Sequence, residues 1–243
     1  LNTDGSFLEL KQRSMKLEVI GDSITSGEGL AGGIDEEDWI PQWFCASKTY
    51  AVLTAKTLNA ELSVVSQCGW GIGWGWNGDL NSRIPPHYEN VCSLLSGELH
   101  EKLGTKNKYN FGEGADFVVV NLGTNDNGAF NQPPWVDENG VTHEYKKDEK
   151  GKAYKEVGNK VKEGVYDFLK VIREKNPKAK IIWVHGMYKL DAILDYLLDG
   201  INIYKNDVSD KFVYALELDS MYEIEKFPED KGSRGHPGPT THK

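Results

Sequence analysis

The side chains best suited to chemistry in this 243-residue chain are a serine near its start and a histidine near its end. Ser23 closes the run Gly21-Asp22-Ser23, directly after the alternating apolar stretch 15–20, and this pattern predicts a strand that breaks into a turn. A serine at the carboxyl end of a strand can expose its hydroxyl, and its backbone N–H can donate to an oxyanion. An isolated Gly-Asp-Ser is more often a plain turn, so the context decides.

The histidine, His236, lies in the glycine- and proline-rich tail 230–239, after the last expected strand. An unactivated hydroxyl is a weak nucleophile, and a neutral imidazole can accept its proton near neutral pH. His236 is therefore a suitable partner for Ser23, although a lone histidine in a loop is more often a surface residue.

Two further polar turns follow expected strands. The turn Gly123-Thr124-Asn125-Asp126 comes directly after 116–122, the most continuous apolar run in the chain. A turn around Gly69 follows a short strand expected at 62–66. Ligands bind at the carboxyl edge of an open α/β sheet, where turns of this kind lie.

Strands and helices alternate along the chain, which predicts an α/β fold: a three-layer α/β/α sandwich with a mostly parallel central sheet. Besides the strands above, the periodicity predicts helices over about 47–59, 154–175 and 190–204 and strands over 180–185 and 211–216. Residues 127–151 lack periodicity, and so long a loop favours a lid or subsite wall.

The chain shows no convincing internal domain boundary. Residues 1–14 are expected to be a polar lead-in or linker, and residues 15–243 a single domain. The apolar fraction of 39% and charged fraction of 27% are ordinary for a globular protein. A formal charge of −9 without a basic face argues against nucleic acid or an anionic membrane as partner, and no apolar run approaches a span of about 20 residues.

No metal or cofactor is expected. The patterns HExxH, GxxxxGK[ST] and GxGxxG are absent, so zinc peptidase and nucleotide chemistry have no support. Cys45, Cys68 and Cys92 are odd in number and lack a CxxC spacing, which indicates neither a disulfide framework nor a zinc site. At most one pair of them could form a bridge.

Tryptophans alternate with glycines at Trp70, Trp74 and Trp76. They either pack in the core or form an aromatic platform beside a cleft, as in many carbohydrate sites. On the second interpretation these three and Trp135 flank the substrate. His185, at the end of an expected strand, could also line the pocket.

The four polar features occur in the order Gly21-Asp22-Ser23, Gly69, Gly123-Thr124-Asn125-Asp126 and His236-Pro237. In this order they resemble the SGNH, or GDSL, hydrolase superfamily, over roughly residues 15–240. The resemblance implies the flavodoxin-like SGNH fold. It also implies that Ser23 is the nucleophile and His236 the general base, and that the N–H groups of Ser23 and Gly69 and the Asn125 amide form an oxyanion hole.

The chain departs from this superfamily at the acid that usually orients the histidine. Many members have an aspartate three residues before it, where this chain has Ser233, and some use the residue two before, here Arg234. Asp230 could fold back to orient His236, or a backbone carbonyl could hold the imidazole N–H. Loss of the acid is expected to lower activity without abolishing it.

The segment 13–25 also resembles the start of the catalytic domain in carbohydrate esterase family 2. These enzymes remove acetyl groups from plant-wall polysaccharides. Their catalytic domain usually follows a β-sandwich domain, which we expect to be absent here. The family would be expected to continue past residue 243 into a closing helix. The resemblance implies an acetylated xylan- or mannan-type substrate, no evident protein partner, and a secreted or cell-surface bacterial protein. The alternatives are a lipase- or lysophospholipase-like esterase of the same superfamily, and a glycan-binding domain whose catalytic machinery has decayed.

Overall fold

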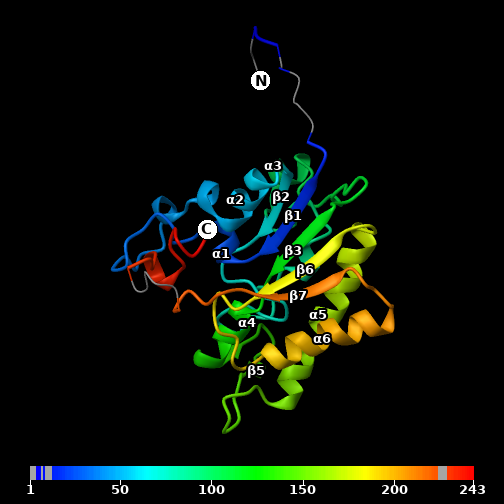
Figure 1. Cartoon of the computed structure of the whole chain (residues 1–243). Helices are drawn as coiled ribbons and strands as arrows, with labels where there is room; N and C mark the ends of the chain where they lie inside the picture. The colour runs from blue at the N-terminus through cyan, green and yellow to red at the C-terminus, as the bar shows by residue number, and fades with distance from the viewer. Residues whose placement is uncertain (1–3, 7, 9–12, 224–228) are drawn as a thin grey trace.

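The computed structural model describes residues 4–6, 8, 13–223 and 229–243, so the lead-in is largely outside the described residues. At its centre lies a five-stranded, all-parallel sheet in the order β2-β1-β3-β6-β7 (Figure 1). Its strands are β1 Lys16–Gly21, β2 Glu61–Ser66, β3 Phe117–Asn121, β6 Lys180–His185 and β7 Val213–Glu217. The predicted α/β fold with a parallel sheet is confirmed.

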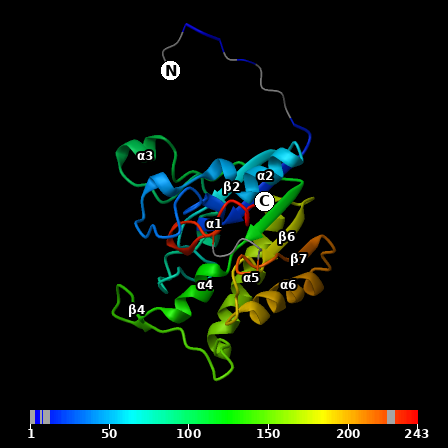
Figure 2. The same cartoon turned by 60° about the vertical axis from the view of Figure 1, so that its left-hand side comes forward.

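The helices cover the two faces of the sheet. The long helices α5 (Lys155–Lys175) and α6 (Leu194–Asp207) pack against each other on one face, and α2 (Tyr50–Thr57) lies on the other (Figures 1 and 2). Short helices are α1 Ser23–Ser26, α3 Glu98–Lys102 and α4 Thr124–Gly128, and the 3-10 turns are Pro41–Trp43, Ala46–Lys48, Pro85–His87, Ala129–Asn131 and Ser233–Gly235.

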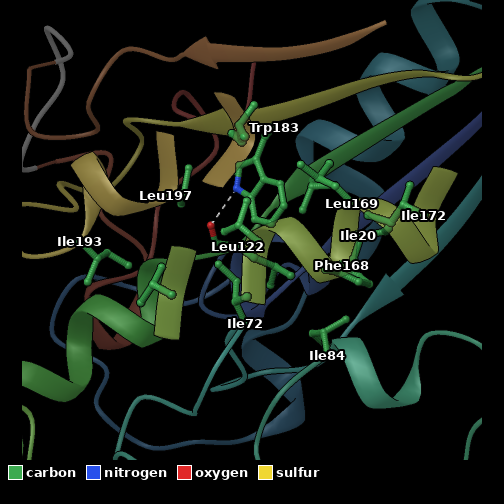
Figure 3. Packing of buried hydrophobic residues seen from close by; sticks show 14 of the residues in the cluster. Ile20, Ile72, Ile84, Leu122, Phe168, Leu169, Ile172, Trp183, Ile193 and Leu197 are labelled. Carbon is green, nitrogen blue, oxygen red and sulfur yellow. Dashed lines mark hydrogen bonds between the residues drawn. The ribbon is translucent and has the colours of Figure 1, made fainter. Parts of the chain in front are cut away.

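Alternation along the strands divides the core between the two faces. Ile20, Val118 and Val120 point toward α5 and α6, where they join the larger cluster around Trp183, whose Nε1 donates to the carbonyl of Leu122 at 3.2 Å (Figure 3). The neighbouring residues Leu17 and Val19 pack instead with Ala51 and Ala55 of α2. Successive side chains of a strand point to opposite faces, so a nearly continuous apolar run is what a doubly covered strand requires.

Several boundaries differ from the sequence-based expectation. Thr49 caps α2 by accepting from the N–H of Val52, so this helix begins at Tyr50 and ends at Thr57. The helix expected from residue 190 begins at Leu194. The stretch 127–151 contains a small antiparallel hairpin, β4 (Trp135–Val136) with β5 (Thr142–His143), which its sequence does not predict.

In the described part of the chain, no helix has both the length and the apolar character to cross a membrane.

Candidate active site

Three polar turns leave the same edge of the sheet because of the strand register. Gly21 at the end of β1 pairs with Ser66 of β2 on one side and with Asn121 of β3 on the other. Ser23, Gly69 and Asn125 follow these paired residues by two, three and four positions. The residues that the sequence singles out are therefore brought together by the sheet itself.

Ser23 and His236 are in direct contact. The Nε2 atom of His236 lies 2.9 Å from the Oγ of Ser23, within hydrogen-bond distance. Ser23 is the first residue of α1, and Asp22 before it caps this helix by accepting from the N–H of Ile24 at 3.0 Å. The short helix turns the chain sharply at the strand end, so the hydroxyl faces the pocket described below.

His236 is held against the nucleophile by bonds between two loops. The N–H of Ser233 donates to the carbonyl of Gly29 at 3.0 Å, and the N–H of Arg234 donates to that of Glu36 at 2.9 Å. Gly29 has a φ of +76°, and a Cβ at that position would lie 2.5 Å from the Ser233 oxygen and 2.7 Å from the His236 Cβ. The close approach of the loops thus depends on glycine at position 29.

The surroundings of His236 favour a neutral imidazole. Burial lowers its pKa below the ordinary 6.5, while the charge of Glu28 and the nearby carbonyls of Ser233 and Arg234 oppose this shift. Among residues 4–6, 8, 13–223 and 229–243, no acceptor meets hydrogen-bond geometry with its buried Nδ1 atom. A neutral ring with Nε2 facing a hydroxyl can act as a general base near neutral pH.

Asn125 and Gly69 lie beside the nucleophile. The Nδ2 atom of Asn125 donates to the carbonyl of Trp70 at 2.9 Å and reaches the Oδ2 of Asp22 at 3.2 Å. Gly69 has a φ of +76°, which favours glycine there. Burial raises the pKa of Asp22 to about 7, and the charge of Asp126 adds to this shift.

Asp126 has a structural role that the sequence does not indicate. Its buried carboxylate accepts from the N–H groups of Ile72 and Gly73 at 2.9 and 2.8 Å, and more weakly from Trp74 at 3.4 Å. Burial raises its pKa to about 6, while these bonds act in the opposite direction. Asp126 therefore fixes the loop that carries Gly69.

A pocket of about 330 Å³ opens over the Ser23–His236 pair. Trp39 and Trp76, with 58% and 48% of their surface exposed, both line it. The described residues that line it are Ser23, Glu28, Trp39, Gln67, Cys68, Gly69, Trp76, Asn125, Arg234 and His236. A larger, mainly apolar cavity of about 650 Å³ lies by α2 and the C-terminal residues, but it contains neither Ser23 nor His236.

The expected aromatic platform is only partly present. Trp76 lines the pocket, but Trp74 is 1% exposed and its Nε1 donates to the carbonyl of Asp126 at 3.0 Å, so its expected substrate contact is wrong. Trp70 packs on His87 in a neighbouring cavity that shares Gln67 with the pocket. Trp135 packs on His143 in the hairpin, away from the pocket lining.

His185 does not join the pocket over Ser23 either. It is 8% exposed and lines a separate cavity beyond the end of β6. Conversely, the pocket over Ser23 is also lined by Trp39, Glu28 and Gln67, which the sequence did not predict as site residues. Only Trp39 carried a signal, because it is a tryptophan inside a glycine-rich acidic loop.

The expected acid does not reach the histidine. The carboxylate of Asp230 accepts from the N–H groups of Thr240 and Thr241, each at 2.7 Å, so its expected return to His236 is not observed. The hydroxyl of Ser233 is buried and has no hydrogen-bond partner among the residues that the structure describes, and Arg234 pairs with Glu28. Among the described residues, no group of three or more metal-ligating side chains gathers to hold an ion.

No family model matches the chain. A solved acetyl xylan esterase, Est2A from Butyrivibrio proteoclasticus, is 40% identical with a TM-score of 0.89, over 99% of this chain and 64% of that one. A family two carbohydrate esterase from Clostridium thermocellum, in complex with cellohexaose, is 24% identical with a TM-score of 0.72, over 97% of this chain and 62% of that one. An acetylxylan esterase / glucomannan deacetylase from Cellvibrio japonicus is 30% identical over 111 residues, 46% of this chain and 29% of that protein.

The fold and the polar turns at its sheet edge define an α/β domain with a serine–histidine pair at the carboxyl end of a parallel sheet. The chain is similar to acetyl xylan esterases and to a family two carbohydrate esterase, so the resemblance predicted from the sequence is confirmed. The relatives are named as hydrolases of carboxylic esters, which agrees with the expected enzyme class. The chain spans less than two thirds of the length of each of these relatives.

Proposed function

We propose that this protein is a serine esterase that removes O-acetyl groups from plant-cell-wall carbohydrate of the xylan or mannan type. The observation that carries the proposal is the 2.9 Å contact between the Oγ of Ser23 and the Nε2 of His236 beneath an open pocket. The names of the relatives support the acetylated carbohydrate, and two exposed tryptophans at the pocket offer flat faces to sugar rings.

In the proposed reaction, His236 takes the hydroxyl proton of Ser23 as its Oγ attacks the acetyl carbonyl. The tetrahedral oxyanion accepts from the N–H groups of Ser23 and Gly69 and from the amide of Asn125, which exchanges the longer of its two bonds, that to Asp22, for the oxyanion. Collapse of this intermediate breaks the bond to the sugar oxygen, which receives the proton from His236. Water, deprotonated by the same imidazole, then releases acetate from the acyl-enzyme.

The size and polarity of the pocket favour a short acyl group. A volume of about 330 Å³, with Glu28, Gln67 and Arg234 in the lining, offers no long aliphatic groove at Ser23. This argues against a lipase- or lysophospholipase-like activity. We further propose that the protein is secreted or displayed at a bacterial cell surface, in keeping with the bacterial origin of the relatives.

The second candidate is a glycan-binding domain with decayed machinery. One observation favours it: in the described part of the chain, no acid accepts a hydrogen bond from the Nδ1 atom of His236. It predicts binding of xylan or glucomannan oligosaccharides without release of acetate.

Hydrolysis of 4-nitrophenyl acetate, butyrate and octanoate by the wild type and by Ser23→Ala tests the proposal. We expect acetate to be preferred, turnover to fall at least 1,000-fold in Ser23→Ala, and acetate to be released from acetylated xylan or mannan. Ser47→Ala, at an exposed position away from the pocket lining, is the matched control and should retain full activity. Absence of Ser23-dependent turnover on every ester would refute the esterase proposal and favour glycan binding.

A further inference from the structure

A buried carboxylate faces His236 from the loop that carries the nucleophile. Glu28 follows Ser23 by five positions, and only 6% of its side chain is exposed. Its Oε2 atom lies 3.8 Å from the Nε2 of His236, and its Oε1 lies 3.4 Å from the Nη1 of Arg234. A carboxylate so deeply buried requires a compensating charge, which the guanidinium of Arg234 supplies while His236 is neutral.

The partner of Glu28 lies on the histidine loop. Arg234 precedes His236 by two positions and has a φ of +53°, with its N–H bonded to Glu36. The pair Glu28–Arg234 therefore spans the two loops whose contact brings Ser23 and His236 together. The carboxylate of Asp230 is bonded to Thr240 and Thr241, and within the part of the chain that the structure describes it makes no hydrogen bond to His236.

We propose that Glu28 is the positioning acid of this site: held by Arg234, its carboxylate stabilises the imidazolium of His236 through space from the Nε2 side. The proposal rests on the proposed esterase mechanism, in which His236 becomes cationic when the Ser23 proton arrives. At 3.8 Å in a mostly buried site, an opposite charge lowers the free energy of that cation substantially. No hydrogen-bonded acid at Nδ1 is then needed.

The other groups around His236 leave Glu28 and Arg234 as its principal charged neighbours. His242, at the C-terminal turn, has its pKa lowered to about 4 by burial, so it is neutral near pH 7. Burial and the neighbouring Glu28 raise the pKa of the Cys68 thiol to about 12, so this group is neutral as well. Asp22 lies behind Ser23 in the field of Glu28, and its own pKa of about 7 reflects burial first.

The two partners of the pair act on His236 in opposite directions. The charge of Glu28 raises the pKa of His236, and the charge of Arg234 lowers it. Glu28→Gln should therefore shift the His236 titration to lower pH by about one pH unit, and Arg234→Gln should shift it to higher pH. A purely structural role of the pair would impair both variants without opposite shifts.

NMR titration of carbon-13-labelled histidine, with the His236 signal assigned from His236→Asn, measures these shifts without substrate. The conservative variant Glu28→Asp keeps the charge and should titrate near the wild type. In parallel, the acid limb of kcat/KM on 4-nitrophenyl acetate should move to lower pH in Glu28→Gln, and its plateau should fall about 10- to 100-fold.

An unchanged His236 titration in Glu28→Gln, or equal shifts in Glu28→Gln and Arg234→Gln, would overturn the assignment. If Glu28→Gln does not fold, the double variant Glu28→Gln/Arg234→Gln, which removes both charges of the pair, is compared with Arg234→Gln. The proposal then requires the His236 titration of the double variant to lie at lower pH than that of Arg234→Gln, and equal titrations would overturn it. Absence of turnover in the wild type with opposite shifts in the titration would refute the esterase proposal and leave the role of Glu28 supported.

Discussion

Ser23 and His236 are 213 positions apart in the sequence and meet because backbone bonds join the loops that carry them. The types of these two residues could be predicted from the sequence, since a serine after one strand and a histidine after the last strand suit the chemistry. Glu28 could not, because nothing in the sequence places an acidic loop residue opposite a histidine more than 200 positions away. The geometry of single residues at this site is thus set by loop contacts that no local pattern encodes.

Gly29 provides a direct test of this loop contact. Gly29→Ala should lower kcat at least 100-fold, because its Cβ would lie 2.5 Å from the Ser233 oxygen and 2.7 Å from the His236 Cβ, in a left-handed backbone conformation. Steady-state kinetics on 4-nitrophenyl acetate give the result. The control Gly33→Ala lies on the same loop with its nearest neighbour at 3.8 Å, and should keep wild-type kinetics. Equal activity of the two variants would show that the loops tolerate the displacement.

At the scale of elements, the loop that follows β2, residues 67–76, explains why Trp74 and Trp76 of one glycine–tryptophan pattern differ in role. A Cβ at Gly71 would lie 2.3 Å from the Oδ2 of Asp126, so glycine is needed there. The carboxylate of Asp126, which follows another strand, accepts from the N–H groups of residues 72–74. This turns Trp74 into the core and leaves Trp76 at the pocket. Sequence spacing alone could not separate them, because the carboxylate that decides lies 52 to 54 positions away.

Substitution of Trp76 should therefore change substrate binding, and substitution of Trp74 should change stability. Trp76→Ala should raise KM for acetylated xylan or mannan about tenfold, since a sugar ring loses its aromatic face, while kinetics on 4-nitrophenyl acetate change little. Trp74→Ala should lower the free energy of unfolding by about 3–5 kcal/mol through the cavity it leaves. Polysaccharide kinetics and urea unfolding of both variants measure the split. A loss of stability in Trp76→Ala equal to that of Trp74→Ala would contradict it.

For the whole molecule, the alternation of strands and helices was enough to predict a parallel sheet with helices on both faces. The strand order β2-β1-β3-β6-β7 places β1 and β3 side by side, and this adjacency brings Ser23 and Asn125 into one pocket. The hairpin β4–β5 escaped prediction because each of its strands has two residues, too few for any periodicity to register. The helix starts differ from the periodicity because Thr49 caps α2 and because a turn, closed by bonds from the N–H groups of Ile193 and Leu194 to the carbonyl of Leu190, precedes α6.

The three cysteines allow a test of whether the hydrophobic core keeps the molecule folded without a disulfide bond. Cys45, Cys68 and Cys92 are all free and half-buried, so the melting temperature should be the same with and without dithiothreitol. The intact mass before and after alkylation in denaturant should show three free thiols. A count of one free thiol, with a melting temperature that changes on reduction, would contradict the structure.

In the folded protein, iodoacetamide should modify Cys68 at least tenfold more slowly than in the unfolded chain, because burial and Glu28 raise its thiol pKa to about 12 and only the thiolate reacts. Peptide mapping over a time course measures that rate, and it would report the same Glu28 field that is proposed to act on His236.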